Sequence, residues 1–291
     1  MRLSSAFLRR LETFPSRFQF RCSSRLSNEG EKKNVRKLIG GTEFAQHRKY
    51  GPGDDIRYID WKLYARFRSF YVKIFSEEIS ESIHIMVDVS RSMDFGSPNK
   101  FDSAMTLAAG LSLLSLRALD RISIYLWDTQ IRRSLINLRG VPSFPKVVEF
   151  LESARSTRNS TNLEIACREL ISKRIIPGPI WIISDFYDAN QFDHALSLLS
   201  HHRFLPLPIR VLDRNETSFI NTGNYTLIDS ETGRTESFSA TKSGKKEYAE
   251  RFERFNSQLC EISRARGVIL REMMTDFPTE EFLMRLLRDY Q

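Results

Sequence analysis

The sequence lacks the patterns that mark several large classes of protein. Its three cysteines, Cys22, Cys167 and Cys260, lie far apart and form no Cys-x-x-Cys pair, so neither a disulfide framework nor a zinc site is expected. The five histidines show no metalloprotease spacing, and no P-loop or Gly-x-Ser-x-Gly motif occurs. The longest apolar run, Ala104–Leu119, contains two serines and an arginine and is too short and too polar to span a bilayer. These absences predict a cytoplasmic protein with no membrane span and a buried helix at this run.

The excess of positive over negative charge lies in the first quarter of the chain. The 291 residues carry a formal net charge of +8, and residues 1–77 hold 17 Lys and Arg against 8 Asp and Glu. Such a segment can meet nucleic acid, an anionic membrane or an acidic protein, but a solvated basic surface is commoner and nucleic acid is not favoured. Its Arg- and Ser-rich start is also typical of transit peptides, although an amphipathic helix packing Leu3, Phe7, Leu8 and Leu11 is preferred.

Behind this basic extension, strand and helix signals alternate from residue 78 to residue 291. Apolar runs predict strands at Ile83–Val87, Arg121–Trp127, Pro179–Ser184, Leu207–Leu212 and Val268–Met273. Helices are predicted at about Lys100–Ala118, Phe144–Ala154, Leu163–Lys173, Gln191–His201, Lys245–Arg266 and Thr279–Tyr290. A β-hairpin is predicted at 225–238. The alternation predicts an α/β domain, doubly wound, with a mainly parallel sheet and helices on both faces.

The first of these strands ends in three oxygen-bearing residues spaced two apart. Asp88, Ser90 and Ser92 place one carboxylate and two hydroxyls on a single loop. Because open α/β sheets keep their ligand sites at the carboxyl ends of the strands, this loop is a candidate site. One charge and two neutral oxygens suit a hard divalent cation, most readily Mg²⁺, with Mn²⁺ or Ca²⁺ as alternatives.

Two further oxygen donors follow later strands. One is in the polar loop 156–162, where Thr161 precedes a predicted helix, and the other is Asp185, which ends the strand 180–184. Each has a structural alternative: Thr161 and Glu164 could form a capping box, and Asp185 or Asp88 could satisfy turn backbone groups. Taken together, in this order, they favour a metal site.

Asp-x-Ser-x-Ser after a first strand, a Thr before a later helix and an Asp after the next strand resemble the metal-ion-dependent adhesion site of von Willebrand factor A-type domains. The resemblance implies that Asp88, Ser90, Ser92, Thr161 and Asp185 hold the ion, directly or through water. Thr157 lies in the same loop as Thr161, and the run Ser160-Thr161-Asn162-Leu163 favours Thr161.

The upstream Tyr50-x-Pro-Gly-Asp-Asp-x-Arg-x-Ile-Asp-Trp segment and the later Ser184-Asp185-Phe186 also resemble the bacterial domain-of-unknown-function family fifty-eight. Members are commonly encoded beside MoxR-type AAA+ ATPases. The resemblance therefore implies an adaptor or co-chaperone of such an ATPase, or a module that binds its client. The density of Arg and Asp in the upstream segment itself suggests an ion-pair network around a turn, for which a structural role is favoured over a functional one.

The leading hypothesis is a non-catalytic interaction module that binds an acidic partner residue through the metal. Hydrolysis needs a positioned base or nucleophile, and none is evident in the sequence. The alternative is a metal-dependent hydrolase or nuclease that uses the same loop, with Asp94 or Asp128 supplying further carboxylates.

Overall fold

The computed structural model describes residues 7, 10, 43–76, 81–157, 159–217, 223–228, 235–240 and 242–289. The chain divides into two compact units, one formed by residues 1–21 and 81–291 and the other by residues 22–80. Of the predicted opening helix, Phe7 and Arg10 are described; both are helical, and Phe7 is buried in the core of the larger unit. The basic extension 1–77 as a separate domain stays a prediction.

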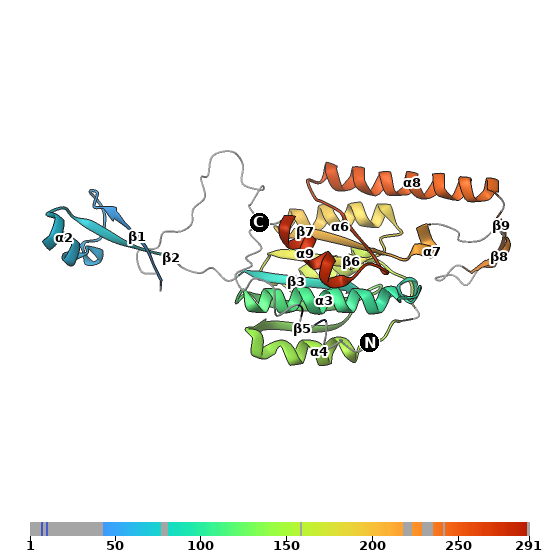
Figure 1. Ribbon diagram of the computed structural model, residues 1–291, viewed down its shortest axis with the longest axis horizontal. Helices are drawn as coiled ribbons and strands as arrows, with labels where there is room; N and C mark the ends of the chain where they lie inside the picture. Colours follow the sequence, from blue (N-terminus) through green and yellow to red (C-terminus); the bar gives the residue numbers. More distant parts are fainter. Residues whose placement is uncertain are drawn as a thin grey trace. The chain divides into compact units, whose positions relative to one another are not determined.

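The larger unit is built on one six-stranded sheet, with strand order β10-β7-β6-β3-β4-β5 (Figure 1). Its strands are β3 (Ser82–Asp88), β4 (Arg121–Trp127), β5 (Ile131–Arg139), β6 (Pro179–Ser184), β7 (Leu205–Leu212) and β10 (Arg271–Met274). All neighbouring pairs are parallel except β4 and β5, which are antiparallel. The carboxyl ends of β3, β4, β6 and β7 therefore meet at one edge of the sheet.

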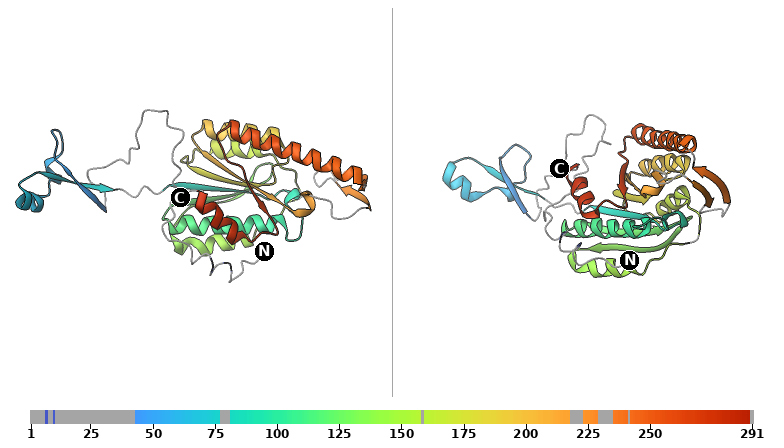
Figure 2. Two further views of the ribbon diagram at one scale, coloured as in Figure 1. Left: turned by 45° about the horizontal axis from the view of Figure 1, so that its top comes forward. Right: turned by 45° about the vertical axis from the view of Figure 1, so that its right-hand side comes forward.

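Helices cover both faces of this sheet (Figure 2). On one face lie α3 (Lys100–Arg117), α4 (Phe144–Glu152) and α9 (Thr279–Asp289), and on the other α5 (Leu163–Ser172), α6 (Ala189–His201) and α8 (Lys242–Ala265). The strand side chains alternate between the two cores, so that Ile85 and Val87 pack with α3 while Met86 packs with α5 and α6. The predicted α/β class with helices on both faces is confirmed.

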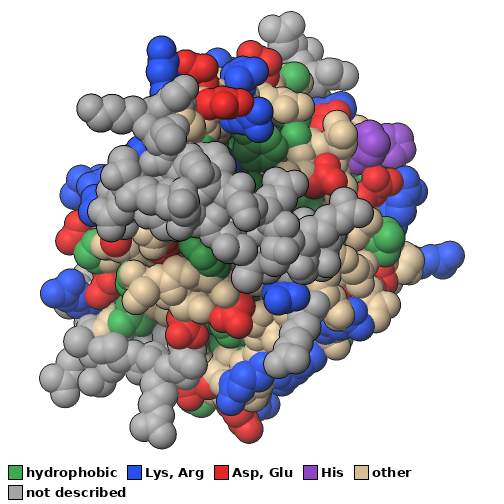
Figure 3. Space-filling model, turned by 90° about the vertical axis from the view of Figure 1, so that its right-hand side faces the viewer, with side chains coloured by type: hydrophobic (Ala, Val, Ile, Leu, Met, Phe, Trp, Pro, Cys, Tyr) green, Lys and Arg blue, Asp and Glu red, His purple; other side chains and the backbone are tan. Residues whose placement is uncertain are grey.

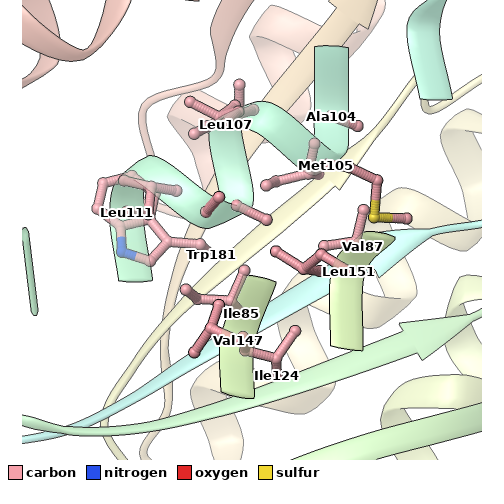
Figure 4. Close-up of a cluster of buried hydrophobic side chains, with 14 of the residues drawn as sticks. Ile85, Val87, Ala104, Met105, Leu107, Leu111, Ile124, Val147, Leu151 and Trp181 are labelled. Carbon is pink, nitrogen blue, oxygen red and sulfur yellow. The ribbon is translucent and has the colours of Figure 1, made fainter. Parts of the chain in front are cut away.

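The core beneath α3 consists mainly of buried aliphatic side chains, with Trp181 among them (Figure 4). Leu107 and Leu111 of α3 lie against Trp181 of β6, and Val147 of α4 lies near Ile85. The serines in this apolar helix do not break it, because Ser112 and Ser115 each donate a side-chain hydrogen bond to the carbonyl four residues earlier. The buried helix expected at residues 104–119 is present as α3, which ends at Arg117, two residues before the end of that run.

Two edge strands differ from the sequence prediction. β5 was not predicted, because Arg132, Arg133 and Asn137 give it the polar composition of a loop; edge strands tolerate such charges. β10 begins at Arg271, three residues later than the predicted start at Val268. At the predicted hairpin, β8 (Gly223–Ile228) and β9 (Thr235–Ala240) pair antiparallel. A short helix, α7 (Arg214–Thr217), follows β7.

The smaller unit is a hairpin of β1 (Glu43–Lys49) and β2 (Tyr71–Ser76), with η1 (Ile56–Tyr58) and α2 (Trp61–Phe67) between them. Asp60 caps α2 by accepting from two backbone N–H groups, and its other oxygen bonds to His47 at 3.0 Å. Arg48 pairs with Asp54 at 2.6 Å and Arg57 pairs with Asp55 at 2.6 Å. The acidic residues of the Gly-Pro-Gly-Asp-Asp segment thus bond within this unit.

None of the described helices combines the length and apolarity that crossing a bilayer requires. Figure 3 shows the end of the larger unit at which α7 lies, and where this face is coloured the acidic and basic side chains are interspersed. The coloured part of this face therefore shows no large patch of positive side chains alone.

Candidate metal centre

The loop after β3 holds its three oxygen donors close together. The carboxylate of Asp88 accepts a 2.8 Å hydrogen bond from the backbone N–H of Ser90, which turns the chain back over the strand end. The next residues form a 3₁₀ turn, η2 (Arg91–Met93), which brings the hydroxyls of Ser90 and Ser92 to 3.1 Å from each other. Asp88 and Ser90 are fully buried. The local sequence thus fixes a carboxylate and two hydroxyls at one point.

A second loop, residues 156–162, is bonded onto the first. The backbone N–H of Thr157 donates to the carbonyl of Val89 at 2.6 Å, and the N–H of Arg91 donates to the carbonyl of Asn159 at 3.1 Å. These bonds place Thr161 beside the strand end, where its hydroxyl lies 3.3 Å from Oδ2 of Asp88. The N-cap of α5 is Asn162, which accepts from the N–H of Ile165, so Thr161 is not the capping residue.

Thr157, the alternative donor, faces another carboxylate. Its hydroxyl donates to Asp128 at 3.0 Å, and Asp128 also accepts from Asn159 and from Nε of Arg132. Burial alone would raise the pKa of Asp128, but these hydrogen bonds lower it to about 2. Asp128 is therefore a charged anchor for the loop, and its bonds leave Thr161 as the hydroxyl next to Asp88.

Asp185 follows β6, the strand beside β3, and only one of its two carboxylate oxygens is bonded. Oδ2 accepts a 2.9 Å hydrogen bond from Nζ of Lys100, while Oδ1 is buried and has no hydrogen-bond partner. The preceding residue, Ser184, donates a 2.6 Å bond to Oδ2 of Asp88 and links the two strand ends. Asp88 is the last residue of β3, and the other four predicted residues lie in the segments that follow β3, precede α5 and follow β6, at the same edge of the sheet.

Electrostatics make this edge unfavourable for two bare carboxylates. Burial and the neighbouring charge of Asp185 raise the pKa of Asp88 above its ordinary value, although hydrogen bonds from Ser184 and Ser90 act in the opposite direction. A divalent cation between the two acids would relieve both the repulsion and the unpartnered oxygen of Asp185. Two carboxylates and three hydroxyls form a hard, oxygen-only donor set, which fits Mg²⁺, Mn²⁺ or Ca²⁺ rather than a soft metal.

Across the described ranges, no group of three or more His, Cys, Asp or Glu side chains could hold a metal ion. The candidate centre has only two acids, and its other donors are neutral hydroxyls. Asp94, considered as a further ligand, accepts a 2.9 Å bond from Asn99. Asp128 accepts hydrogen bonds from Thr157, Asn159 and Arg132.

Sequence reasoning missed two residues of this site. Lys100 is the first residue of α3 and has the position of an ordinary solvated lysine, yet its side chain is fully buried against Asp185. Ser184 ends an apolar strand and belongs to the Ser184-Asp185-Phe186 run of the family resemblance, but nothing in the sequence indicates that its hydroxyl bonds to Asp88. The inward direction of these two side chains cannot be predicted from the sequence, because it depends on the packing of β6 against β3 and α3.

The chain belongs to the family described as protein of unknown function DUF58, which matches residues 46–258. A relative, the uncharacterized protein Mb1516 of Mycobacterium bovis, is 25% identical over an alignment of 248 residues that covers 81% of this chain and 75% of the relative.

This chain is also similar in fold to solved structures. One is the conserved hypothetical protein BatB from Bacteroides thetaiotaomicron, with a TM-score of 0.43 and 11% identity over 72% of this chain and 98% of that chain. Another is the von Willebrand A domain of SpRpn10, with a TM-score of 0.41 and 10% identity over 72% of this chain and 95% of that chain.

Proposed function

We propose that this protein is a non-catalytic interaction module that binds an acidic side chain of a protein partner through a divalent metal ion. The ion, Mg²⁺ in the first instance, would be held by Asp88, Ser90, Ser92, Thr161 and Asp185. The observation that carries the proposal is the buried, unpartnered Oδ1 of Asp185 beside a second buried carboxylate and three hydroxyls. A buried carboxylate oxygen without a donor is costly, and a cation would satisfy it.

The neutral hydroxyls support binding rather than hydrolysis. With only two carboxylates in the site, a bound divalent ion would keep positive charge that attracts an anionic ligand. The residues of the chain position the donors: Ser90 N–H and Ser184 orient Asp88, and Lys100 orients Asp185. The hydrolase or nuclease alternative requires more carboxylates around the ions, and Asp94 and Asp128 bond elsewhere.

Titration of Mg²⁺ into the full chain by calorimetry tests the metal. We expect saturable binding by the wild type and none by Asp88→Ala, while Glu149→Ala, which removes an exposed carboxylate from α4, binds as the wild type does. Equal heats for the wild type and Asp88→Ala would contradict the proposal.

The partner proposed from the family resemblance is a MoxR-type AAA+ ATPase or its client, in the cytoplasm. The purified chain should then bind such an ATPase in Mg²⁺ and release it in EDTA. Binding that persists unchanged in EDTA and in Asp88→Ala would rule out the metal as the link.

A further inference from the structure

Lys100 is a fully buried cation in direct contact with the candidate metal centre. Its Nζ lies 2.9 Å from Oδ2 of Asp185 and 2.6 Å from Oε1 of Glu216, and its side chain has no exposed surface. The rings of Phe95 and Tyr187 lie 5.8 Å and 5.3 Å from the ammonium. Two carboxylates at ion-pair distance stabilise the ammonium in this buried position, so Lys100 is a buried cation paired with both acids.

The second acid of this group is held independently of the site. Glu216 belongs to α7, and its other oxygen accepts a 2.9 Å bond from the backbone N–H of Asp213, the residue after β7. Both carboxylate oxygens of Glu216 are therefore bonded, one to Lys100 and one to the backbone. The two oxygens of Asp185, by contrast, differ: one accepts a hydrogen bond from Lys100, and the other is buried without a donor.

The difference between Glu216 and Asp185 indicates that the pair of Lys100 and Glu216 is structural and that the pair of Lys100 and Asp185 has a further role. A buried ion pair offsets its desolvation only when its remaining hydrogen-bonding groups are also satisfied. The pair of Lys100 and Glu216 meets this condition, because both carboxylate oxygens of Glu216 are bonded. The pair of Lys100 and Asp185 does not, because one oxygen of Asp185 has no donor. The geometry instead fixes Asp185 by one oxygen and leaves the other oxygen buried without a donor.

Building on the proposed function, we propose that Lys100 is a fixed internal cation of the metal site, which orients Asp185 and sets how much positive charge a bound divalent ion retains. When ionised, Asp88, Asp185 and Glu216 carry three negative charges, and Lys100 compensates one. A divalent ion then makes the group neutral, so it can accept the carboxylate of a partner. Without Lys100 the loaded group would keep a net negative charge, which would bind the ion more tightly and repel an acidic ligand.

Removing the charge of Lys100 and removing the charge of Glu216 should therefore have opposite effects on metal binding. Lys100→Met should raise the affinity for Mg²⁺ by roughly tenfold or more, because it removes a like charge close to the ion. Glu216→Gln should weaken Mg²⁺ binding severalfold, because it removes an attractive charge. The double variant Lys100→Met/Glu216→Gln has the same net charge as the wild type, and its affinity should return toward the wild-type value.

Calorimetric titration of Mg²⁺ into the full chain, with folding checked by circular dichroism, tests this. Lys146→Met removes an exposed lysine near the start of α4, at the end of the sheet where Arg139 pairs with Arg121, and should leave the affinity unchanged. A repeat titration with excess acetate as a carboxylate probe should tighten Mg²⁺ binding by the wild type and not by Lys100→Met.

The outcomes separate the two proposals. If the wild type binds no Mg²⁺, the proposed function itself fails. If the wild type binds but a folded Lys100→Met binds Mg²⁺ equally or more weakly, only the role of Lys100 is overturned. If Lys100→Met does not fold, Glu216→Gln decides, and unchanged or tighter Mg²⁺ binding by that variant would overturn the proposal.

Discussion

Thr157 and Thr161 lie four residues apart in one loop and face different carboxylates. The hydroxyl of Thr157 donates to Asp128 at 3.0 Å, and the hydroxyl of Thr161 lies 3.3 Å from Oδ2 of Asp88. One threonine therefore anchors the loop, and the other stands at the candidate metal centre.

This division predicts different effects of two matched substitutions. Thr161→Val should weaken Mg²⁺ binding by about tenfold, because it removes one oxygen donor at almost constant volume. Thr157→Val should change Mg²⁺ affinity little and lower the free energy of unfolding by about 1 kcal/mol, because the buried Asp128 loses a hydrogen bond. Calorimetry and urea unfolding of both variants measure the two effects, and the reverse assignment would place Thr157 in the site.

Neutralising Asp88 should have opposite effects without and with metal. In EDTA at pH 8, Asp88→Asn should be at least as stable as the wild type, because it removes the repulsion between Asp88 and Asp185. The wild type should gain about 2.7 kcal/mol at an Mg²⁺ concentration one hundred times its Kd, and the variant should gain nothing. Thermal unfolding in EDTA and in Mg²⁺ measures this; an equal Mg²⁺ gain in both proteins would contradict a site at Asp88.

A pair of acids at the opposite end of β3 should make the protein less stable as the pH rises. Burial and the charge of Asp120 raise the pKa of Glu81 from 4.5 to about 7, and the backbone N–H of Glu81 donates to Asp120 at 3.0 Å. Between about pH 4.5 and pH 7 the folded state therefore holds a proton that the unfolded state has lost, and stability falls as the pH rises through this range.

Glu81→Gln should flatten this dependence and stabilise the protein at pH 8 by on the order of 1 kcal/mol, after allowance for solvent screening of a partly exposed group. Urea unfolding across pH 5 to 8 measures it. Glu149→Gln, on the exposed side of α4, serves as the control and should follow the wild-type curve.

The start of β6 should not accept a side chain at Gly178. A Cβ atom there would lie 2.1 Å from the carbonyl oxygen of Ser82, the first residue of β3. Because this contact is with backbone, the two strands would have to separate, and Gly178→Ala should cost more than about 2 kcal/mol. Gly53→Ala in the smaller unit would meet no atom within 4 Å but has a positive φ of 99°, so it should be destabilising through backbone strain alone. Thermal unfolding compares the two, and a Gly178→Ala protein as stable as the wild type would contradict the close approach of β3 and β6.

Much of the fold could be predicted because its signals are local. The apolar runs of β3, β4 and β6 and the Asp-x-Ser-x-Ser spacing after β3 state which segments are buried strands and where oxygen donors follow them. Parallel strands then bring those donors to one edge whatever the helices do. The polar edge strand β5 could not be predicted from the sequence, because an edge strand needs few apolar residues and forms by pairing with β4.

The sequence by itself determined the α/β class and the order of the main elements, and it placed Asp88, Ser90, Ser92 and Asp185 at strand ends, with a threonine-bearing loop between them. Only the tertiary structure decided which threonine faces Asp88, that Ser184 bonds to Asp88, and that Lys100 is buried against Asp185 and Glu216. The reason is physical: residue type and spacing fix local conformation and burial preference, whereas the partner of a buried charge depends on which chain segments, up to 116 residues apart, pack at the same point.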